Sequence, residues 1–220
     1  MKKNISFKII KILIGLSLAL TILIGPVLMI SFNRPYYDNY IAKNDFKSLQ
    51  KEDASNIIYN ILDFLMHKKE LDDRFTENEK SHMNDVRKIF DVLLISYFIS
   101  GALLISSIIF IKIKQKNLFL IIKPIKLGAL SILILGLIII VASLINFDSS
   151  FIVFHELFFP QGNWSFPETS LLITLFTEHF FYKTGIKIFT IVLIQAAILS
   201  AASIFFEYNN KKSKKPTKSK

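Results

Sequence analysis

The chain has 220 residues, of which 52% are apolar and none is cysteine, and its formal net charge is +10. The lack of thiols excludes disulfides, cysteine nucleophiles and cysteine-bound metals. The apolar residues form continuous runs of about 18 or more, the length that a helix needs to cross a bilayer, which excludes an ordinary water-soluble domain.

Four runs are long enough to cross a membrane, and they predict an all-α membrane protein with four transmembrane helices and a helical extracytoplasmic cap. The spans are expected within residues 1–32, which include an N-terminal anchor, and at 89–113, 127–147 and 186–207. The connecting segments are an extracytoplasmic amphipathic segment with the start of the second helix (33–88), a basic loop (114–126), an aromatic, partly re-entrant loop (148–185) and a basic tail (208–220).

The lysines beside the spans predict the orientation of the chain, because cytoplasmic flanks carry an excess of Lys and Arg. They precede the first span, separate the second from the third and follow the fourth: Lys2, Lys3, Lys8, Lys11, Lys112, Lys114, Lys116, Lys123, Lys126, Lys211, Lys212, Lys214, Lys215, Lys218 and Lys220. Glu207 alone opposes them. We therefore expect a multi-pass cell-membrane protein with both termini in the cytoplasm. This distribution accounts for the net charge without a nucleic-acid partner.

The first run begins like a signal sequence, but the residues of its second half are too bulky for a cleavage site. We therefore expect an uncleaved anchor with a kink at Pro26. None of the four runs carries a charge near its middle, which argues against an ion or proton pathway.

The first outer segment contains two helical signals. Apolar residues recur at helical spacing through Ser48–His67, which predicts an amphipathic helix. Thr76 and Glu79 have the spacing of a capping box, so a second helix is expected to begin there and to run through His82 into the second span. A group on such a helix is held more rigidly than one on a loop.

His82 and Asp85 are three residues apart and so lie on the same face of that helix. A carboxylate in this position can orient an imidazole and raise its basicity. From the spacing alone, a surface His–Asp pair that does no chemistry is the more common case. His67, near the end of the amphipathic helix, is expected only to favour the helix dipole.

His155 lies in a short, strongly aromatic segment, 151–159, that Pro160 ends. Apolar surroundings would keep its imidazole neutral and able to accept a proton. The alternative is a histidine that merely anchors the segment at the headgroup level. Trp164 follows in a turn as an aromatic anchor, and Glu178 would either orient His155 or cap the last span.

Two blocks centred on these histidines, together with the four-span layout, resemble the bacterial lipoprotein intramolecular transacylase family. The blocks are Glu79-Lys80-Ser81-His82-Met83-Asn84-Asp85-Val86 and Phe154-His155-Glu156-Leu157-Phe158-Phe159-x-x-Gly162-x-Trp164, the second continuing through Leu175-Phe176-x-Glu178-x-Phe180-Phe181. The resemblance covers nearly the whole chain. It departs at Thr177, where the family has proline, which affects only the shape of that loop.

The resemblance implies an acyltransferase that moves the sn-2 acyl chain of a lipoprotein's diacylglyceryl-cysteine to the α-amine of the same cysteine. Its partners would be diacylglyceryl-modified lipoproteins and membrane lipids, and the chain is expected to be a monomer with its site at the outer leaflet. The family's essential histidines correspond to His82 and His155, with Asp85, Glu178 and Trp164 in support. Such chemistry needs no cofactor or metal, and which histidine is the base stays open, as does a covalent acyl-histidine.

Two other functions remain compatible with the residues. A membrane scaffold or assembly factor would use the aromatic segments as partner surfaces. A metal hydrolase would use His82, His155 and Asp85 or Glu178, since two histidines and an acid form a known zinc set.

Overall fold

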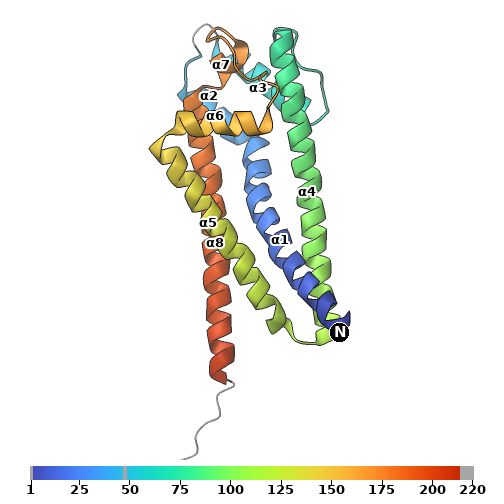
Figure 1. Ribbon diagram of the computed structural model, residues 1–220. Coiled ribbons are helices and arrows are strands. Elements are labelled where there is room, and N and C mark those ends of the chain that lie inside the picture. The colour runs from blue at the N-terminus through green and yellow to red at the C-terminus, as the bar shows by residue number, and fades with distance from the viewer. Residues whose placement is uncertain (1, 47–48, 214–220) are drawn as a thin grey trace, which may run out of the picture. The chain divides into compact units, whose positions relative to one another are not determined.

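The computed structural model describes residues 2–46 and 49–213, and every element in these ranges is helical. In chain order (Figure 1) they are α1 (Lys2–Ser31), α2 (Arg34–Lys43), α3 (Lys51–Leu65), α4 (Glu77–Gln115), the 3₁₀ helix η1 (Leu118–Ile121), α5 (Ile122–Ile145), α6 (Phe147–Phe158), α7 (Leu171–Leu175) and α8 (Glu178–Ser213). The predicted all-α class is confirmed.

Four helical segments are long and apolar enough to cross a membrane, as the sequence predicts: Phe7–Ser31, Glu77–Gln115, Leu118–Ile145 and Glu178–Lys212. Helix α4 has 39 residues. At 1.5 Å per residue it is about 58 Å long, whereas the hydrocarbon core is about 30 Å thick. Its charged beginning, residues 77–88, therefore precedes the apolar part that starts at Ile89.

The described residues form two compact units. The first contains 2–26, 95–139 and 189–213. Within it, Gly128 of α5 meets Gly15 of α1, where a Cβ on Gly128 would lie only 2.4 Å from the Gly15 carbonyl oxygen. Thr21 of α1 hydrogen-bonds Ser100 of α4 at 3.2 Å. These contacts depend on small side chains, which let apolar helices approach closely.

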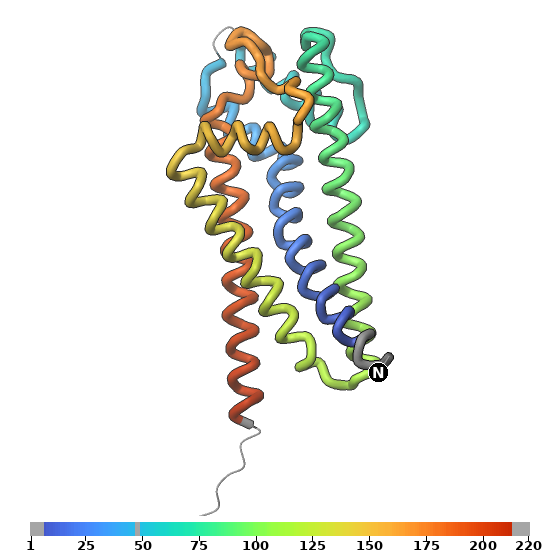
Figure 2. The backbone as a smooth tube through the Cα atoms, in the orientation of Figure 1, coloured from blue at the N-terminus to red at the C-terminus, as the bar shows by residue number. Residues whose placement is uncertain are grey.

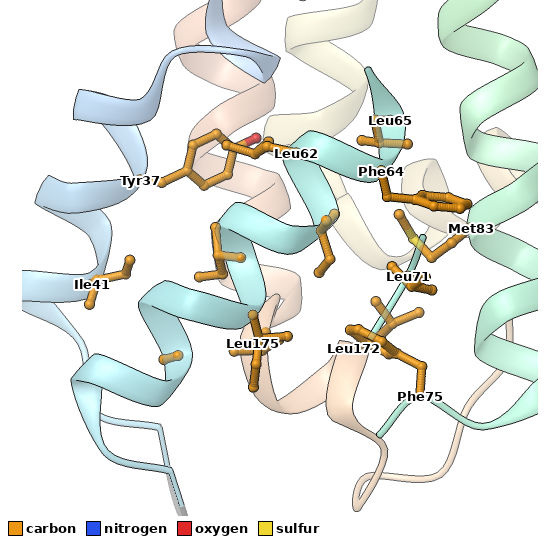
Figure 3. Packing of buried hydrophobic residues seen from close by; sticks show 14 of the residues in the cluster. Tyr37, Ile41, Leu62, Phe64, Leu65, Leu71, Phe75, Met83, Leu172 and Leu175 are labelled. Carbon is orange, nitrogen blue, oxygen red and sulfur yellow. The ribbon is translucent and has the colours of Figure 1, made fainter. Parts of the chain in front are cut away.

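The second unit contains 27–46, 49–94 and 140–188 and has a core built around α3. The apolar positions that predict an amphipathic helix are buried here, and Figure 3 shows Leu62, Phe64 and Leu65 packed with Met83 of α4 and with Leu172 and Leu175 of α7. The helix is slightly shorter than predicted and ends at Leu65, so His67 lies beyond it.

The capping box at the start of α4 is confirmed. The Thr76 hydroxyl accepts a bond from the Glu79 N–H at 3.3 Å, and the Glu79 carboxylate accepts bonds from the Thr76 N–H and hydroxyl, both at 2.9 Å. Helix α4 then continues without a break through His82. This histidine is therefore carried on a continuous helix, as the sequence predicts.

Asparagine side chains start two helices of the second unit. Asn33 caps α2, a helix that the sequence reasoning did not anticipate, by accepting a bond from the Tyr36 N–H at 3.1 Å. Asn146 caps α6 by accepting a bond from the Ser149 N–H at 3.0 Å. Figure 2 shows the sharp turn of the chain between the last residues of α5 (140–145) and α6.

Candidate functional site

His82 lies on the second turn of α4 and is 9% exposed. Its ring packs against Phe159 and Phe166, with centroid distances of 4.6 and 5.5 Å. The capping box just before it fixes the start of the helix, so the backbone that carries the imidazole is well anchored. Aromatic rings rather than water therefore cover most of this side chain.

His155 is the one residue of α6 that is buried, with 8% exposure. Phe151 lies one turn earlier at a centroid distance of 4.0 Å, and Trp164 covers the ring at 4.9 Å. The Nδ1 atom is 2.8 Å from the Phe151 carbonyl oxygen. Because a carbonyl only accepts, Nδ1 carries the proton in this bond, and Nε2 of the neutral ring is left with its lone pair.

The second unit brings these two imidazoles together. Their centroids are 6.3 Å apart and their planes differ by 27°. Phe159 contacts both rings, at 4.6 Å from His82 and 5.6 Å from His155. Two polar rings thus share one aromatic enclosure formed by Phe151, Phe159, Phe166 and Trp164.

Burial keeps both rings uncharged. It lowers the pKa of His82 from 6.5 to about 4, helped by the neighbouring His155 and opposed by Asp85 and Asn163. Burial also lowers the pKa of His155, against the opposing effect of its bond to the Phe151 carbonyl. A buried imidazole resists protonation because its cation is poorly solvated. At neutral pH the site therefore contains two neutral imidazoles.

Asp85 lies beside His82 but makes its hydrogen bonds elsewhere. Its carboxylate accepts bonds from Lys88 at 2.9 Å, Gln161 at 2.7 Å and Asn163 at 2.9 Å. Two of these donors belong to the loop after α6. Asp85 thus ties that loop to α4, and its effect on His82 is electrostatic, since it raises the pKa of the imidazole.

The other two supporting residues have different positions. Trp164 covers His155, as described above. Glu178 is the exposed first residue of α8 and lies near Asp148, close to the start of α6. The bond that orients His155 is made to the Phe151 carbonyl instead. At the start of α8, the side chain that accepts from the Phe180 N–H is the Thr177 hydroxyl.

Three residues near the histidine pair were not anticipated from the sequence: Phe166 of the enclosure, and Gln161 and Asn163, which donate to Asp85. The available signal was the short Gly162-x-Trp164 turn, where Gly162 has a φ of 77°, a conformation that glycine adopts at little cost. This turn directs Asn163 towards α4 and Trp164 towards α6. Recognising it as a bridge between the two histidines required the fold.

The remaining histidines lie outside the enclosure. His67 is exposed and pairs with Asp91 at 2.9 Å, and His179 is also exposed. In the described part of the chain, no three or more His, Cys, Asp or Glu side chains are grouped to hold a metal ion. The acids that the hydrolase alternative would use are Asp85 and Glu178, which have the partners given above.

Two of the comparisons with known proteins found matches. The family model described as "Lipoprotein intramolecular transacylase Lit" matches residues 12–181. The structure of the membrane-integral lipoprotein intramolecular transacylase Lit from Bacillus cereus is 19% identical, with a TM-score of 0.78, covering 96% of this chain and 98% of that one.

Two further structures come from the same Bacillus cereus protein, each with one histidine replaced, by arginine or by alanine. They are 17% and 16% identical, both with a TM-score of 0.74, and cover 96% of this chain and 96% and 97% of theirs. At these identities the likeness is one of fold. The search of curated proteins gave no match.

Proposed function

Because the chain belongs to the lipoprotein intramolecular transacylase family and is therefore an acyltransferase, we propose that it moves an acyl chain within one lipoprotein molecule. The chain leaves the sn-2 ester oxygen of the diacylglyceryl-cysteine and joins the α-amine of the same cysteine. A C–O bond breaks, an N–C bond forms, and the glycerol oxygen leaves as an alcohol. The product is a lyso-form lipoprotein with an N-acyl group.

The observation that carries this proposal is the pairing of His82 and His155, two neutral imidazoles with centroids 6.3 Å apart in an aromatic enclosure. The transfer needs a group that takes a proton from the amine and returns it to the glycerol oxygen, which is a task for a neutral imidazole. We assign the base to His155, whose Nε2 has a free lone pair, and the proton relay or oxyanion contact to His82. Acid–base help of this kind typically contributes about 10²–10⁴-fold.

The reaction also gains from having donor and acceptor in one molecule. A well-aligned intramolecular reaction avoids about 7–11 kcal/mol of barrier. The aromatic enclosure contributes by excluding water, which would otherwise compete with the amine and release a free fatty acid. A metal ion, cofactor or serine nucleophile is then not required.

The proposed setting is the outer leaflet of the cell membrane, with both termini in the cytoplasm and the chain acting as a monomer. The support is the distribution of lysines in the flanks of the spans. Membrane lipids would surround the exposed apolar side chains of α6, among them Val153 at 62% and Leu157 at 72% exposure.

The test is mass spectrometry of a reporter lipoprotein from cells that express the wild-type chain, His82→Ala or His155→Ala. The wild type should give an N-acylated lyso-form, and both variants should leave diacylglyceryl-cysteine with a free amine at wild-type expression. His67→Ala and His179→Ala are matched controls outside the enclosure and should behave as wild type. If the reporter is unchanged in cells that express the wild type, the proposed transfer is ruled out. If His82→Ala and His155→Ala both still give the N-acylated form, the scaffold alternative is favoured.

A further inference from the structure

Two buried polar atoms at the histidine pair, Nδ1 of His82 and Oδ1 of Asn163, have no hydrogen-bond partner among the residues that the structure describes. Buried polar atoms without a partner are uncommon and need an explanation. These two are complementary, because an amide oxygen only accepts and an imidazole nitrogen can donate. They also belong to neighbouring groups, since Asn163 raises the pKa of the His82 imidazole.

The orientation of the Asn163 amide is set by its other contacts. Its Nδ2 donates to the Asp85 carboxylate at 2.9 Å and to the Ser81 hydroxyl at 3.2 Å. A carboxylate that already accepts from Lys88 and Gln161 can only accept from Asn163 as well. The NH₂ group must therefore face Asp85, and the amide oxygen is directed to the other side.

From this arrangement we propose that Asn163 is a positioning residue that accepts the Nδ1 proton of His82. Asp85 fixes the amide, the amide fixes the imidazole tautomer, and the Nε2 atom of His82 keeps its lone pair. The Phe151 carbonyl does the same for His155. The two histidines, held by acceptors on different segments, then both present an unprotonated Nε2. This inference rests on the proposed function and adds the starting protonation state of both rings.

The two unprotonated Nε2 atoms match the number of protons that the substrate amine must lose. An α-amino group has a pKa of about 8, so at neutral pH it arrives mostly as an ammonium ion. Forming the amide removes two protons from it. One ends on the departing glycerol oxygen, and the other passes to water. With Nε2 of each ring free, one imidazole can take the first proton and the other can carry the second to the glycerol oxygen.

A reversed amide would have the opposite effect. If the NH₂ group of Asn163 faced His82, it would donate to Nδ1 and place the ring proton on Nε2. His82 would then begin as a proton donor. Asp85→Asn allows this reversal, because an amide at position 85 can donate to Oδ1 of Asn163. The double variant Asp85→Asn/Asn163→Asp restores an acceptor facing His82 and a donor facing that acceptor.

The first measurement is nuclear magnetic resonance of the full-length protein, labelled with ¹⁵N-histidine and reconstituted in lipid nanodiscs without substrate. The chain has 4 histidines, few enough to assign by single substitutions. The wild type should show His82 with its proton on Nδ1, and Asn163→Ala should give a mixture of tautomers. A wild-type His82 with its proton on Nε2 overturns the inference, whatever the activity of the protein.

The second measurement is transfer kinetics with a diacylglyceryl-cysteine lipopeptide in liposomes. Asn163→Ala and Asp85→Asn should each lower kcat by about 10–100-fold, part of the acid–base contribution, with KM within about threefold of wild type. The double variant should recover at least tenfold over Asp85→Asn. In the double variant, the carboxylate introduced at position 163 should raise the pKa of His82. The acid limb of the pH profile should therefore move to higher pH.

Gln161→Ala is the matched control, because it removes a bond to the same carboxylate without facing the imidazole. Its kcat should fall less than about threefold. Equal losses in Gln161→Ala and Asn163→Ala, or no recovery in the double variant, would reduce Asn163 to a loop anchor and overturn the inference. A wild type that transfers nothing contradicts the proposed function instead, and the tautomer measurement still decides the role of Asn163.

Discussion

Glu79 and Leu172 are joined by a buried hydrogen bond, in which the Leu172 N–H donates to the Glu79 carboxylate at 2.9 Å. The same carboxylate closes the capping box with Thr76 and is only 1% exposed. One side chain thus anchors both the start of α4, which carries His82, and the start of α7. The chain that leads to α7 carries Trp164 and Phe166, so this contact supports the enclosure from outside it.

Replacing Glu79 should therefore destabilise the protein. Glu79→Ala leaves the Leu172 and Thr76 N–H groups without their acceptor, at a cost of about 2–3 kcal/mol. The measurement is the Tm of the protein in detergent. Glu77→Ala is the control, because this nearby carboxylate is exposed and forms a surface ion pair with Lys80, and it should cost less than about 1 kcal/mol. Equal losses in the two variants would show that the buried contact contributes little.

A second prediction concerns the glycines of the first unit. Gly128→Ala should destabilise by about 1–3 kcal/mol, because the added methyl group meets the backbone of Gly15 rather than a movable side chain. Gly101→Ala on α4 has open space around it and should be neutral or stabilising by up to about 1 kcal/mol, since alanine favours helix. Thermal unfolding of both variants measures the difference, and a stable Gly128→Ala protein would contradict the close contact.

A third prediction follows from the lowered histidine pKa values. The pKa of His82 is about 4 in the folded chain and 6.5 in its ordinary state, so between these values the unfolded chain binds more protons. Stability should therefore fall as the pH drops from about 6.5 towards 4. His82→Leu should flatten this dependence in unfolding measurements made across the window. A wild-type stability that rises on acidification in this window would contradict burial of neutral rings.

A fourth prediction concerns exclusion of water from the histidine pair. Phe159 is 3% exposed and contacts both rings, so Phe159→Ala should admit water beside them. More of the acyl chain should then appear as free fatty acid and less as N-acyl product, measured by mass spectrometry of both. The neighbouring Phe158 is 45% exposed, and Phe158→Ala should keep the wild-type ratio. An unchanged ratio in Phe159→Ala would show that other groups keep the site dry.

Much of this molecule can be predicted from its sequence, because the decisive signals are local. Apolar runs of sufficient length predict four spans, and the Thr76–Glu79 spacing predicts the start of α4. The two histidines stand out because each adjoins an apolar run. Their proximity is consistent with the family resemblance and becomes visible only in the fold.

What the sequence does not reveal are polar contacts between distant segments. Asp85 shares a helix face with His82, which suggests a direct bond, but its carboxylate accepts from Lys88, Gln161 and Asn163 instead. Asn163 carries no local pattern that distinguishes it from other asparagines in turns. Likewise, Asn33 caps the start of α2, and Pro35 lies in its first turn. From the sequence alone, the same residues are also typical of a segment that leaves the membrane. Such choices depend on which groups the tertiary structure brings within reach.

Helix α6 has a consequence for handling the protein. It buries a single side chain, the imidazole of His155, while Val153, Leu157 and others on its outer face are exposed. The outer face of this helix therefore needs contact with hydrocarbon that the polypeptide does not supply. Stripping native lipid with a short-chain detergent should abolish turnover while circular dichroism still reports intact helices, and adding phospholipid back should restore it.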